Sequence, residues 1–236
     1  METLLSVRDL HHGFGAGGTR LEVLTGVDFE VAPGELVALM GPSGCGKSTL
    51  LNIIGGLLAA DSGTVSANGS VYGPQPPHAL VELRRATIGC IFQDYHLLPH
   101  LSALDNVTLA LELAGAAMPE AEQRATAALK RVGLADRTQH RPDELSGGQA
   151  QRVAIARAIA GDRKLLLADE PTGNLDVATS REILELFHEL CAGDSELSIL
   201  MVTHDAALAA RADRMLLLRD GHVAASDVES AWGDAA

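Results

Sequence analysis

The stretch that decides the fold is Gly41-Pro42-Ser43-Gly44-Cys45-Gly46-Lys47-Ser48-Thr49. An apolar run at 36–40 precedes it, and a pattern typical of a helix at 48–58 comes after it. Strand, glycine-rich loop and helix in this order form a phosphate-binding loop, because glycines let many backbone N–H groups approach a polyphosphate. Lys47 would reach the β- and γ-phosphates, and Ser48 would offer its hydroxyl to Mg²⁺. The stretch therefore predicts a nucleotide site.

A second glycine-rich stretch, Leu-Ser-Gly-Gly-Gln at 145–149, starts a predicted helix. The free N–H groups at a helix N-terminus attract anions. This stretch has no side chain able to do chemistry on the nucleotide of its own chain, so its expected target is the nucleotide of a second copy. The two stretches together predict a dimeric ATP-driven motor.

A pair of carboxylates comes directly after the predicted buried strand at 164–168. Asp169 stands at the carboxyl end of that strand, where open α/β sheets bind ligands, and can orient Mg²⁺. Glu170 is next, as expected for a carboxylate that orients or deprotonates the attacking water. The alternative is that Asp-Glu-Pro only ends a strand and caps the next segment; the upstream phosphate loop favours the catalytic interpretation.

Composition narrows the class of protein. The 236 residues suit one α/β domain with a small subdomain, and 47% hydrophobic residues suffice for a real core. Aromatic residues at 3% and a net charge of −13 argue against nucleic-acid binding. The acidic excess is concentrated at 169–236, with 14 acidic and 4 basic residues. The simplest interpretation is a solvated acidic surface that favours solubility.

Cysteine spacing and hydropathy bear on the compartment. The three cysteines show no metal or disulfide pattern, which favours a reducing environment. The N-terminus lacks the features of a signal peptide, and no apolar run approaches the roughly 20 residues of a membrane helix. A membrane role would have to come through a partner.

Apolar patterns predict the remaining elements. Strands are expected at 3–10, 21–31, 64–72, 198–203, 215–219 and 222–225, a turn at 13–18, an exposed loop at 74–77, a helical insert at 95–157 and a helix at 181–191. We expect one domain over 1–226, with a core at 1–93 and 158–226 and a helical subdomain at 94–157. The pattern-poor end, 227–236, is expected to be a disordered tail.

With these motifs in this order, residues 3–225 resemble an ABC-type ATPase, the nucleotide-binding subunit of an ABC transporter. The matching positions are 41–49, Gln93, 145–149, Asp169-Glu170, the loop Gly173-Asn174-Leu175-Asp176 and His204. The resemblance implies an α/β fold: a P-loop NTPase, RecA-like core with an antiparallel β subdomain and an α-helical subdomain. It also implies ATP and Mg²⁺ as cofactors.

The resemblance assigns further roles. Phe14 would stack on adenine, although a lone Phe after a strand also fits a core position. Gln93 would touch Mg²⁺ or the attacking water and link the site to the transport partner. His204 would contact the γ-phosphate, although a lone His after a strand could also be an ordinary surface residue without a role in the site. The implied metal set is Ser48, Gln93 and Asp169, and the implied catalytic set is Glu170, His204, Gln93 and Lys47.

The resemblance also implies a composite site in a homodimer with ATP at the interface. Ser146, Gly147, Gly148 and Gln149 would serve the nucleotide of the partner subunit, and Asp176 would cross the seam. Two departures from the common pattern leave this set intact: Gly-Asn replaces the commoner Ser-Ala at 173–174, and Ala150 stands where many relatives have a polar residue.

Three stretches, 51–57, 92–99 and 169–176, resemble the MacB/LolD group, whose ATPases work with membrane subunits in lipoprotein release or export. Gly-Asn-Leu-Asp also occurs in amino-acid importers and in the cell-division ATPase. A polytopic membrane subunit is thus the expected partner, holding the chain peripherally on the cytoplasmic face of the membrane. Leu97, Leu98 and Leu101 would line the groove for that partner, or else pack the helical core.

Two other classes stay open within the family. One is a non-transporting motor that drives a membrane signalling or cell-wall hydrolase complex. The other is a soluble ATPase that acts on nucleic acid or ribosomes, which the acidity disfavours. Cys45 adds a chemical prediction: Lys47 and a helix N-terminus favour its thiolate, unless it is simply a small residue tolerated there.

Overall fold

A six-stranded sheet forms the centre of the computed structural model, which describes residues 3–15, 17–193 and 196–225. Its strand order is β10-β9-β3-β8-β7-β6. The strands are β3 (Leu36–Met40), β6 (Ile88–Phe92), β7 (Leu165–Asp169), β8 (Ser198–Val202), β9 (Arg214–Arg219) and β10 (His222–Ala225). All neighbours are parallel except β10, which pairs antiparallel with β9. Strands β3 and β8 are buried along their whole length, as helix-covered parallel strands require.

A second, antiparallel sheet has the order β2-β1-β4-β5. Its strands are β1 (Leu5–Phe14), β2 (Leu21–Val31), β4 (Ser62–Ala67) and β5 (Ser70–Tyr72), and a short 3₁₀ turn, η1 (Gly17–Thr19), comes after β1. The predicted pair at 3–10 and 21–31 is confirmed, with β1 extending to Phe14. The single strand predicted at 64–72 is wrong. Asn68 and Gly69 both take positive φ, 47° and 77°, and turn the chain into a hairpin.

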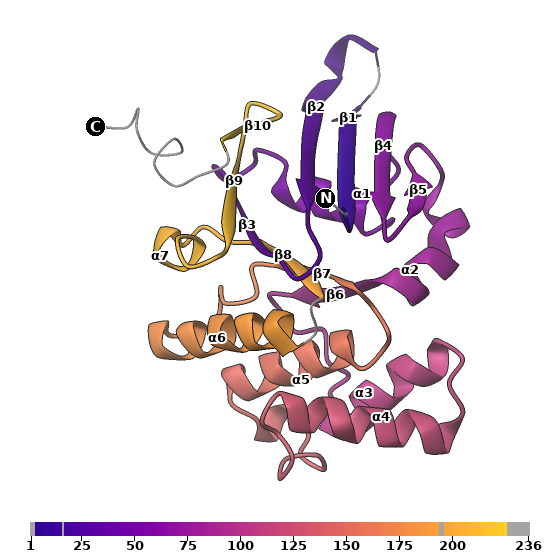
Figure 1. Cartoon of the computed structure of the whole chain (residues 1–236), viewed down its shortest axis with the longest axis vertical. Helices are drawn as coiled ribbons and strands as arrows, with labels where there is room; N and C mark the ends of the chain where they lie inside the picture. Colours follow the sequence, from indigo (N-terminus) through magenta and orange to yellow (C-terminus); the bar gives the residue numbers. More distant parts are fainter. Residues whose placement is uncertain (1–2, 16, 194–195, 226–236) are drawn as a thin grey trace.

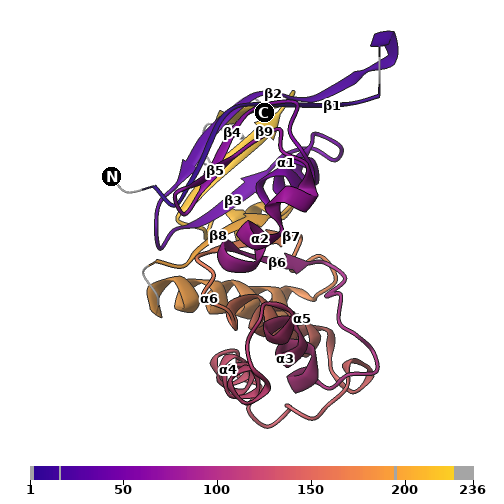
Figure 2. The same ribbon diagram turned by 90° about the vertical axis from the view of Figure 1, so that its right-hand side faces the viewer.

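Helix α1 (Lys47–Ile54) lies between the two sheets, where their apolar faces form one core (Figure 2). Its buried residues pack in the same cluster as Leu10 of β1 and Leu39 of β3. The helix is shorter than the predicted 48–58, because Gly56 takes φ 63° and ends it. This core fixes the phosphate loop between two rigid sheets.

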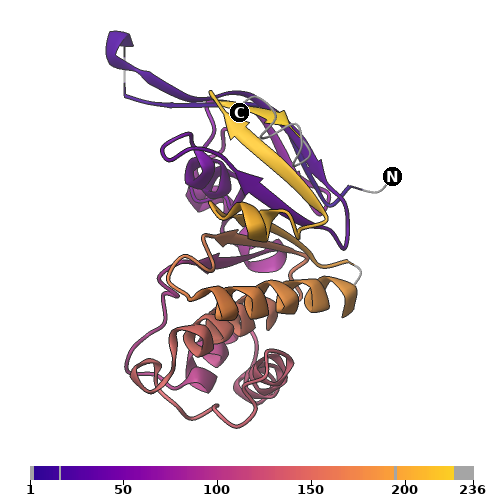
Figure 3. The same ribbon diagram turned by 90° about the vertical axis from the view of Figure 1, so that its left-hand side faces the viewer.

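The opposite face of the parallel sheet carries the main helical layer (Figures 1 and 3). Its helices are α3 (Ala103–Leu113), α4 (Met118–Arg131), α5 (Gly147–Ile159) and α6 (Val177–Gly193). Helix α3 packs on α4 and α5, and their apolar faces join the sheet in a second core. The chain between β6 and β7 supplies α3, α4 and α5, as the predicted helical insert requires. Helix α6 begins before the predicted 181 because Asp176 caps it.

Several elements escaped prediction. They are η2 (Pro77–Leu80), α2 (Val81–Thr87), the edge strand β6, η3 (Pro142–Glu144) and α7 (Ala206–Ala209). The terminal hairpin of β9 and β10 is confirmed, whereas the predicted tail at 227–236 lies outside the described residues. Within the described part of the chain, no helix is both long and apolar enough to cross a bilayer.

Candidate active site

The phosphate loop joins β3 to α1, and two of its glycines cannot be replaced without a clash. Gly41 takes φ 154°, and a Cβ there would lie 2.3 Å from the Leu218 carbonyl oxygen. Gly46 takes the left-handed φ of 105° that starts α1, with Val23 Cγ1 2.7 Å from a Cβ. The first N–H groups of α1 have no partner within the helix, so binding of an anion by this loop stays a prediction.

Lys47 holds its ammonium against the same loop. Its Nζ donates to the Gly41 oxygen at 2.8 Å and to the Pro42 oxygen at 3.0 Å. The Cys45 side chain turns inward, because a Cβ on Gly41 would lie 2.7 Å from its Sγ. Of the remaining predicted loop residues, the structure places Pro42, Ser43, Gly44 and Ser48 in exposed positions and Thr49 in a half-buried one.

Ser48 and Asp169 meet across the gap between α1 and the end of β7. Burial raises the pKa of the Asp169 carboxyl, while a hydrogen bond from Ser48 and the charge of Lys47 oppose that rise. Asp169 Oδ1 is buried and has no hydrogen-bond partner among the described residues. A hydroxyl beside an unsatisfied carboxylate oxygen suits Mg²⁺, which takes few protein ligands and completes its shell with phosphate oxygens and water.

No group of three His, Cys, Asp or Glu side chains within the described part of the chain could hold a metal ion unaided. Because Mg²⁺ takes few protein ligands, oxygens of a nucleotide and of water would complete its shell at Ser48 and Asp169.

Glu170 and His204 form the next pair. Glu170 takes φ 50°, and its N–H donates to the Val202 oxygen at 3.1 Å, which ties the residue to β8. Its Oε2 lies 2.5 Å from His204 Nδ1. The Glu170 side chain is 23% exposed and that of His204 is 70% exposed, so both reach solvent. A carboxylate held by an imidazole at the carboxyl end of the sheet can orient or deprotonate a water molecule.

Gln93 lies beside this pair but bonds elsewhere. Its Nε2 donates to Asn174 Oδ1 at 3.1 Å, and Asn174 Nδ2 donates to the Gln93 oxygen and to Asp94 Oδ1 at 3.2 and 3.3 Å. Gly173 leaves room for the Gln93 side chain. In the sequence, Gly-Asn at 173–174 stands out only as a departure from a pattern, and that departure was the available signal for this contact.

The stretch at 145–149 starts α5 with a capping box. Ser146 Oγ accepts from the Gln149 N–H at 3.3 Å, and Gln149 Oε1 accepts from the Ser146 N–H at 3.0 Å. Gly147 and Gly148 are hemmed in, because a Cβ would lie 3.0 Å from Tyr95 Oη and 2.4 Å from Thr179 Cγ2, respectively. Ser146 and Gly147 themselves are exposed, so this helix start faces outward.

Asp176 and Phe14 are both exposed, in different parts of the fold. Asp176 accepts from the N–H groups of Thr179 and Ala178 at the start of α6, and the Thr179 bonds lead in lowering its pKa. Phe14 ends β1, is 48% exposed and meets the His12 ring edge-on at 4.8 Å. The core alternative for Phe14 is therefore wrong, while its stacking role stays a prediction.

A groove of about 440 Å³ is lined by residues of α2, β6 and α5. Its apolar lining includes Leu57 and Phe92. Its polar lining includes His96 and the guanidinium groups of Arg84, Arg85, Arg157 and Arg163. No carboxylate of the described residues lines it, although the chain has 31 acidic and 18 basic residues. Arg84, Arg157 and Arg163 donate to backbone carbonyls, which fixes their charges in place.

The three predicted docking leucines lie apart from this lining. Leu98 is 48% exposed, Leu97 packs partly against the helical core, and Leu101 lines a separate pocket with Leu104. The exposed position of Leu98 excludes the core alternative for that residue.

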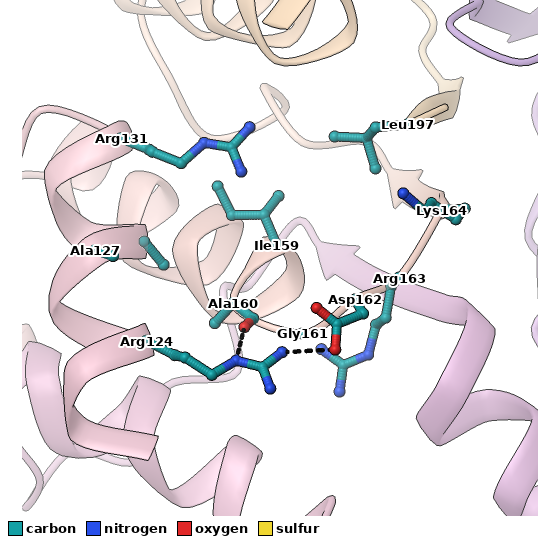
Figure 4. Close-up of a pocket in the computed structure, with 11 residues that line it drawn as sticks. Arg124, Ala127, Arg131, Ile159, Ala160, Gly161, Asp162, Arg163, Lys164 and Leu197 are labelled. Carbon is teal, nitrogen blue, oxygen red and sulfur yellow. Dashed lines mark hydrogen bonds and ion pairs between the residues drawn. The ribbon is translucent and has the colours of Figure 1, made fainter. Parts of the chain in front are cut away.

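A second basic hollow of about 270 Å³ lies between α4 and the loop before β7 (Figure 4). Arg124 spans it, donating to the Ala160 oxygen at 3.2 Å and pairing with Asp162 at 3.1 Å. None of the predicted site residues lines this hollow.

Comparisons with known proteins agree with the motif order. The model of the ABC transporter family matches residues 24–173. The chain is 46% identical to the lipoprotein-releasing system ATP-binding protein LolD of Pseudomonas fluorescens, over 95% of this chain and 98% of that protein. It is 44% identical to the macrolide export ATP-binding/permease protein MacB of Shigella flexneri, over 94% of this chain but 34% of that protein.

Solved structures give the same result. The dimeric ATP-binding cassette MJ0796, in a post-hydrolysis state bound to ADP and Pi, superposes with a TM-score of 0.83 at 36% identity, over 94% of this chain and 97% of that one. CbiO1 of Clostridium perfringens, part of an ABC transporter complex, superposes with a TM-score of 0.87 at 27% identity, over 100% and 92%.

Proposed function

This chain belongs to the ABC transporter family, and from that membership we propose that it is the ATP-binding and hydrolysing subunit that powers a membrane ABC transporter complex. The observation that carries the proposal is the meeting of three features at one sheet edge: the phosphate loop, the Ser48–Asp169 pair and the Glu170–His204 pair. Likeness to LolD and MacB supports lipoprotein release or export as the task. The membrane subunit would select the substrate.

In this proposal the chain's own residues bind ATP and prepare water for attack. Lys47 and the N–H groups of the loop bind the phosphates, and Phe14 stacks on the base. Ser48 and Asp169 would hold Mg²⁺, with Gln93 close by; the ion neutralises charge on the phosphates when bound. Glu170 accepts the proton of the attacking water or orients it, and His204 holds the Glu170 carboxylate and contacts the γ-phosphate.

We propose further that the site is completed by a second copy. The exposed start of α5, with Ser146, Gly147, Gly148 and Gln149, would face the γ-phosphate held by the partner subunit. Asp176 would lie at the seam. The dimeric state of the MJ0796 cassette supports this arrangement.

The groove lined by Arg84, Arg85, Arg157 and Arg163, here called the arginine groove, is the proposed docking surface for the membrane subunit. Four guanidinium groups over an apolar floor, without a carboxylate among the described lining residues, suit an amphipathic cytoplasmic helix that carries acidic residues. The groove begins at Phe92, next to Gln93, so a docked helix would press close to the ATP site. Docking there would keep the chain peripheral, on the cytoplasmic face.

Glu170→Gln tests the hydrolytic role. The variant should bind ATP, lose nearly all turnover, and elute as a dimer in size-exclusion chromatography with ATP and Mg²⁺, because the amide cannot take the proton from water. Glu189→Gln, the same change on the exposed face of α6, is the control and should behave like the parent. Hydrolysis by Glu170→Gln at the parental rate would remove Glu170 from this role.

Capture of partners from detergent-solubilised membranes tests the docking surface. Arg85→Glu reverses a charge at the groove rim, where Arg85 is paired only with Glu82 on its own helix among the described residues. It should lose a polytopic partner that the parent retains. Arg181→Glu makes the same charge change at an exposed position of α6, away from the groove, and this variant should retain the polytopic partner. Equal capture by both variants would place docking elsewhere.

A further inference from the structure

We propose that Asn174 is a positioning residue that holds the Gln93 side chain with its oxygen free for the catalytic site. The inference rests on the proposed ATPase function for its consequence, and on geometry for the contact itself. Strands β6 and β7 are parallel neighbours, with Phe92 opposite Asp169. Gln93 and the loop after Glu170 therefore leave the sheet side by side, and Asn174 lies on that loop.

Both polar atoms of the Asn174 amide form hydrogen bonds with Gln93 or with Asp94 beside it. Its Nδ2 donates to the backbone oxygen of Gln93 and to Asp94 Oδ1, at 3.2 and 3.3 Å, and its Oδ1 accepts from Gln93 Nε2 at 3.1 Å. An amide side chain offers two N–H donors and a carbonyl acceptor, and Asn174 makes two donor contacts and one acceptor contact. The bonds clamp both ends of Gln93, its main chain and its side-chain nitrogen.

The clamp decides which atom of Gln93 faces the site. Once Nε2 is bonded to Asn174, the remaining polar atom of the Gln93 amide is the Oε1 acceptor. A cation or the proton of a water molecule requires an oxygen acceptor. Asn174 therefore selects the useful one of two amide orientations that a free glutamine would interconvert.

Gly173 takes part in the same arrangement. A Cβ at this position would lie 3.0 Å from both Cδ and Nε2 of Gln93, which is closer than ordinary packing permits. Glycine thus clears the space that the Gln93 amide occupies, and asparagine supplies its bonds. A Ser-Ala pair at 173–174 would crowd the amide and leave it without a partner, so Gly173 and Asn174 act together.

The contact is suited to orientation more than to stability. Gln93, Asp94, Gly173 and Asn174 are all exposed, and hydrogen bonds open to water add little to the free energy of unfolding. What they do supply is a fixed direction for one side chain. The Asn174→Ala variant should therefore melt close to the parental temperature.

The first test observes the contact directly, without nucleotide. Side-chain amide signals of the ¹⁵N-labelled full chain are recorded by NMR, and Gln93→Ala identifies the Gln93 pair. In Asn174→Ala that pair should move to the position of a free glutamine amide and exchange faster with water. In Gly173→Ala it should move as well, while Gly193→Ala, which adds a methyl group in open space, should leave it unchanged.

The second test is a double-mutant cycle on ATP hydrolysis. Asn174→Ala should lower kcat roughly 2- to 10-fold, the worth of about one hydrogen bond, and raise the Mg²⁺ concentration for half-maximal rate. ATP binding should stay at the parental affinity. In a Gln93→Ala background, Asn174→Ala should change nothing further, because its effect passes through Gln93.

Two results would overturn the inference: an unchanged Gln93 signal in Asn174→Ala, or a loss of kcat that is as large with Gln93→Ala as without it. A parent chain that fails to hydrolyse ATP would instead overturn the proposed function. The NMR comparison separates the two, because it needs neither ATP nor turnover.

Discussion

Replacement of Ser146 by Ala separates helix stability from composite-site chemistry, because the chain holds a matched control. Ser146 caps α5 and Ser102 caps α3, each through a complete capping box in the same helical layer. Ser102 Oγ accepts from the Asp105 N–H at 3.0 Å, and Ser146 Oγ from the Gln149 N–H at 3.3 Å. Only Ser146 lies in the stretch assigned to the nucleotide of a second copy.

Both variants should lose the stability of the cap, and Ser102→Ala should lose more, because Ser102 is buried and its hydroxyl also donates to Asp105 Oδ2 at 2.6 Å. Loss of an N-cap serine costs about 1 kcal/mol. In a domain of this size, that free energy lowers Tm by roughly 2–4 °C. Differential scanning fluorimetry without nucleotide should therefore give a downward shift for both variants, with the larger shift for Ser102→Ala.

The activity change should differ. A hydroxyl that meets a phosphate contributes roughly 1.5–3 kcal/mol, which is about a 10- to 100-fold change in rate if it acts in the transition state. Ser146→Ala should lose ATPase activity by that factor at about 25 °C, well below melting, whereas Ser102→Ala should keep the parental rate. Equal losses in both, or a parental rate in Ser146→Ala, would refute the assignment of 145–149 to a second nucleotide.

Three further predictions concern single side chains. Asp169→Asn should raise Tm of the nucleotide-free chain at pH 7, because a pKa raised by burial means that ionised Asp169 destabilises the fold above its folded pKa; the gain in Tm over the parent should shrink as the pH falls toward the ordinary Asp pKa. A thiol reagent should inhibit ATP hydrolysis and ATP should protect, since Cys45 lies within the phosphate loop; Cys45→Ser should resist, and inhibition of that variant would implicate another thiol. Leu98→Glu should fold, as melting will show, because Leu98 is exposed; since Leu98 lies outside the lining of the proposed groove, the variant should still assemble with the membrane subunit in the capture assay, and lost assembly would extend the docking surface to Leu98.

Runs of buried apolar residues that end in polar motifs made most of the central sheet predictable. Strand β7 ends at Asp169, β3 ends next to Gly41, and β8 ends two residues before His204, so the apolar run and the site residue could be recognised together. Strand β6 was harder, because it holds Gly89 and Cys90 in a run of five residues. Position 89 requires glycine because α5 packs directly against it: a Cβ there would lie 2.8 Å from the Ala158 oxygen on α5. That requirement comes from a helix distant in sequence and leaves no periodic trace.

Motif spacing identified the site residues but not their partners. The phosphate loop is local, so its strand–loop–helix context could be read directly. The Glu170–His204 and Gln93–Asn174 contacts join residues that come after neighbouring strands, and they depend on strand order. Glu170 also takes a left-handed backbone conformation, which few residues other than glycine adopt and which nothing in the local sequence signals.

The charge of the groove shows most clearly what a linear sequence hides. Its arginines come from α2 in one part of the chain and from α5 and the loop after it in another, so no basic run marks them. The net charge of −13 would repel an acidic helix at long range, but physiological salt screens charges beyond about 8 Å. Within the groove, the guanidinium groups are partly buried, and burial lowers the pKa of Arg157 and Arg163 without discharging them. We therefore expect short-range attraction at the groove to outweigh this screened repulsion, so that an acidic segment of the proposed partner binds there, next to Gln93.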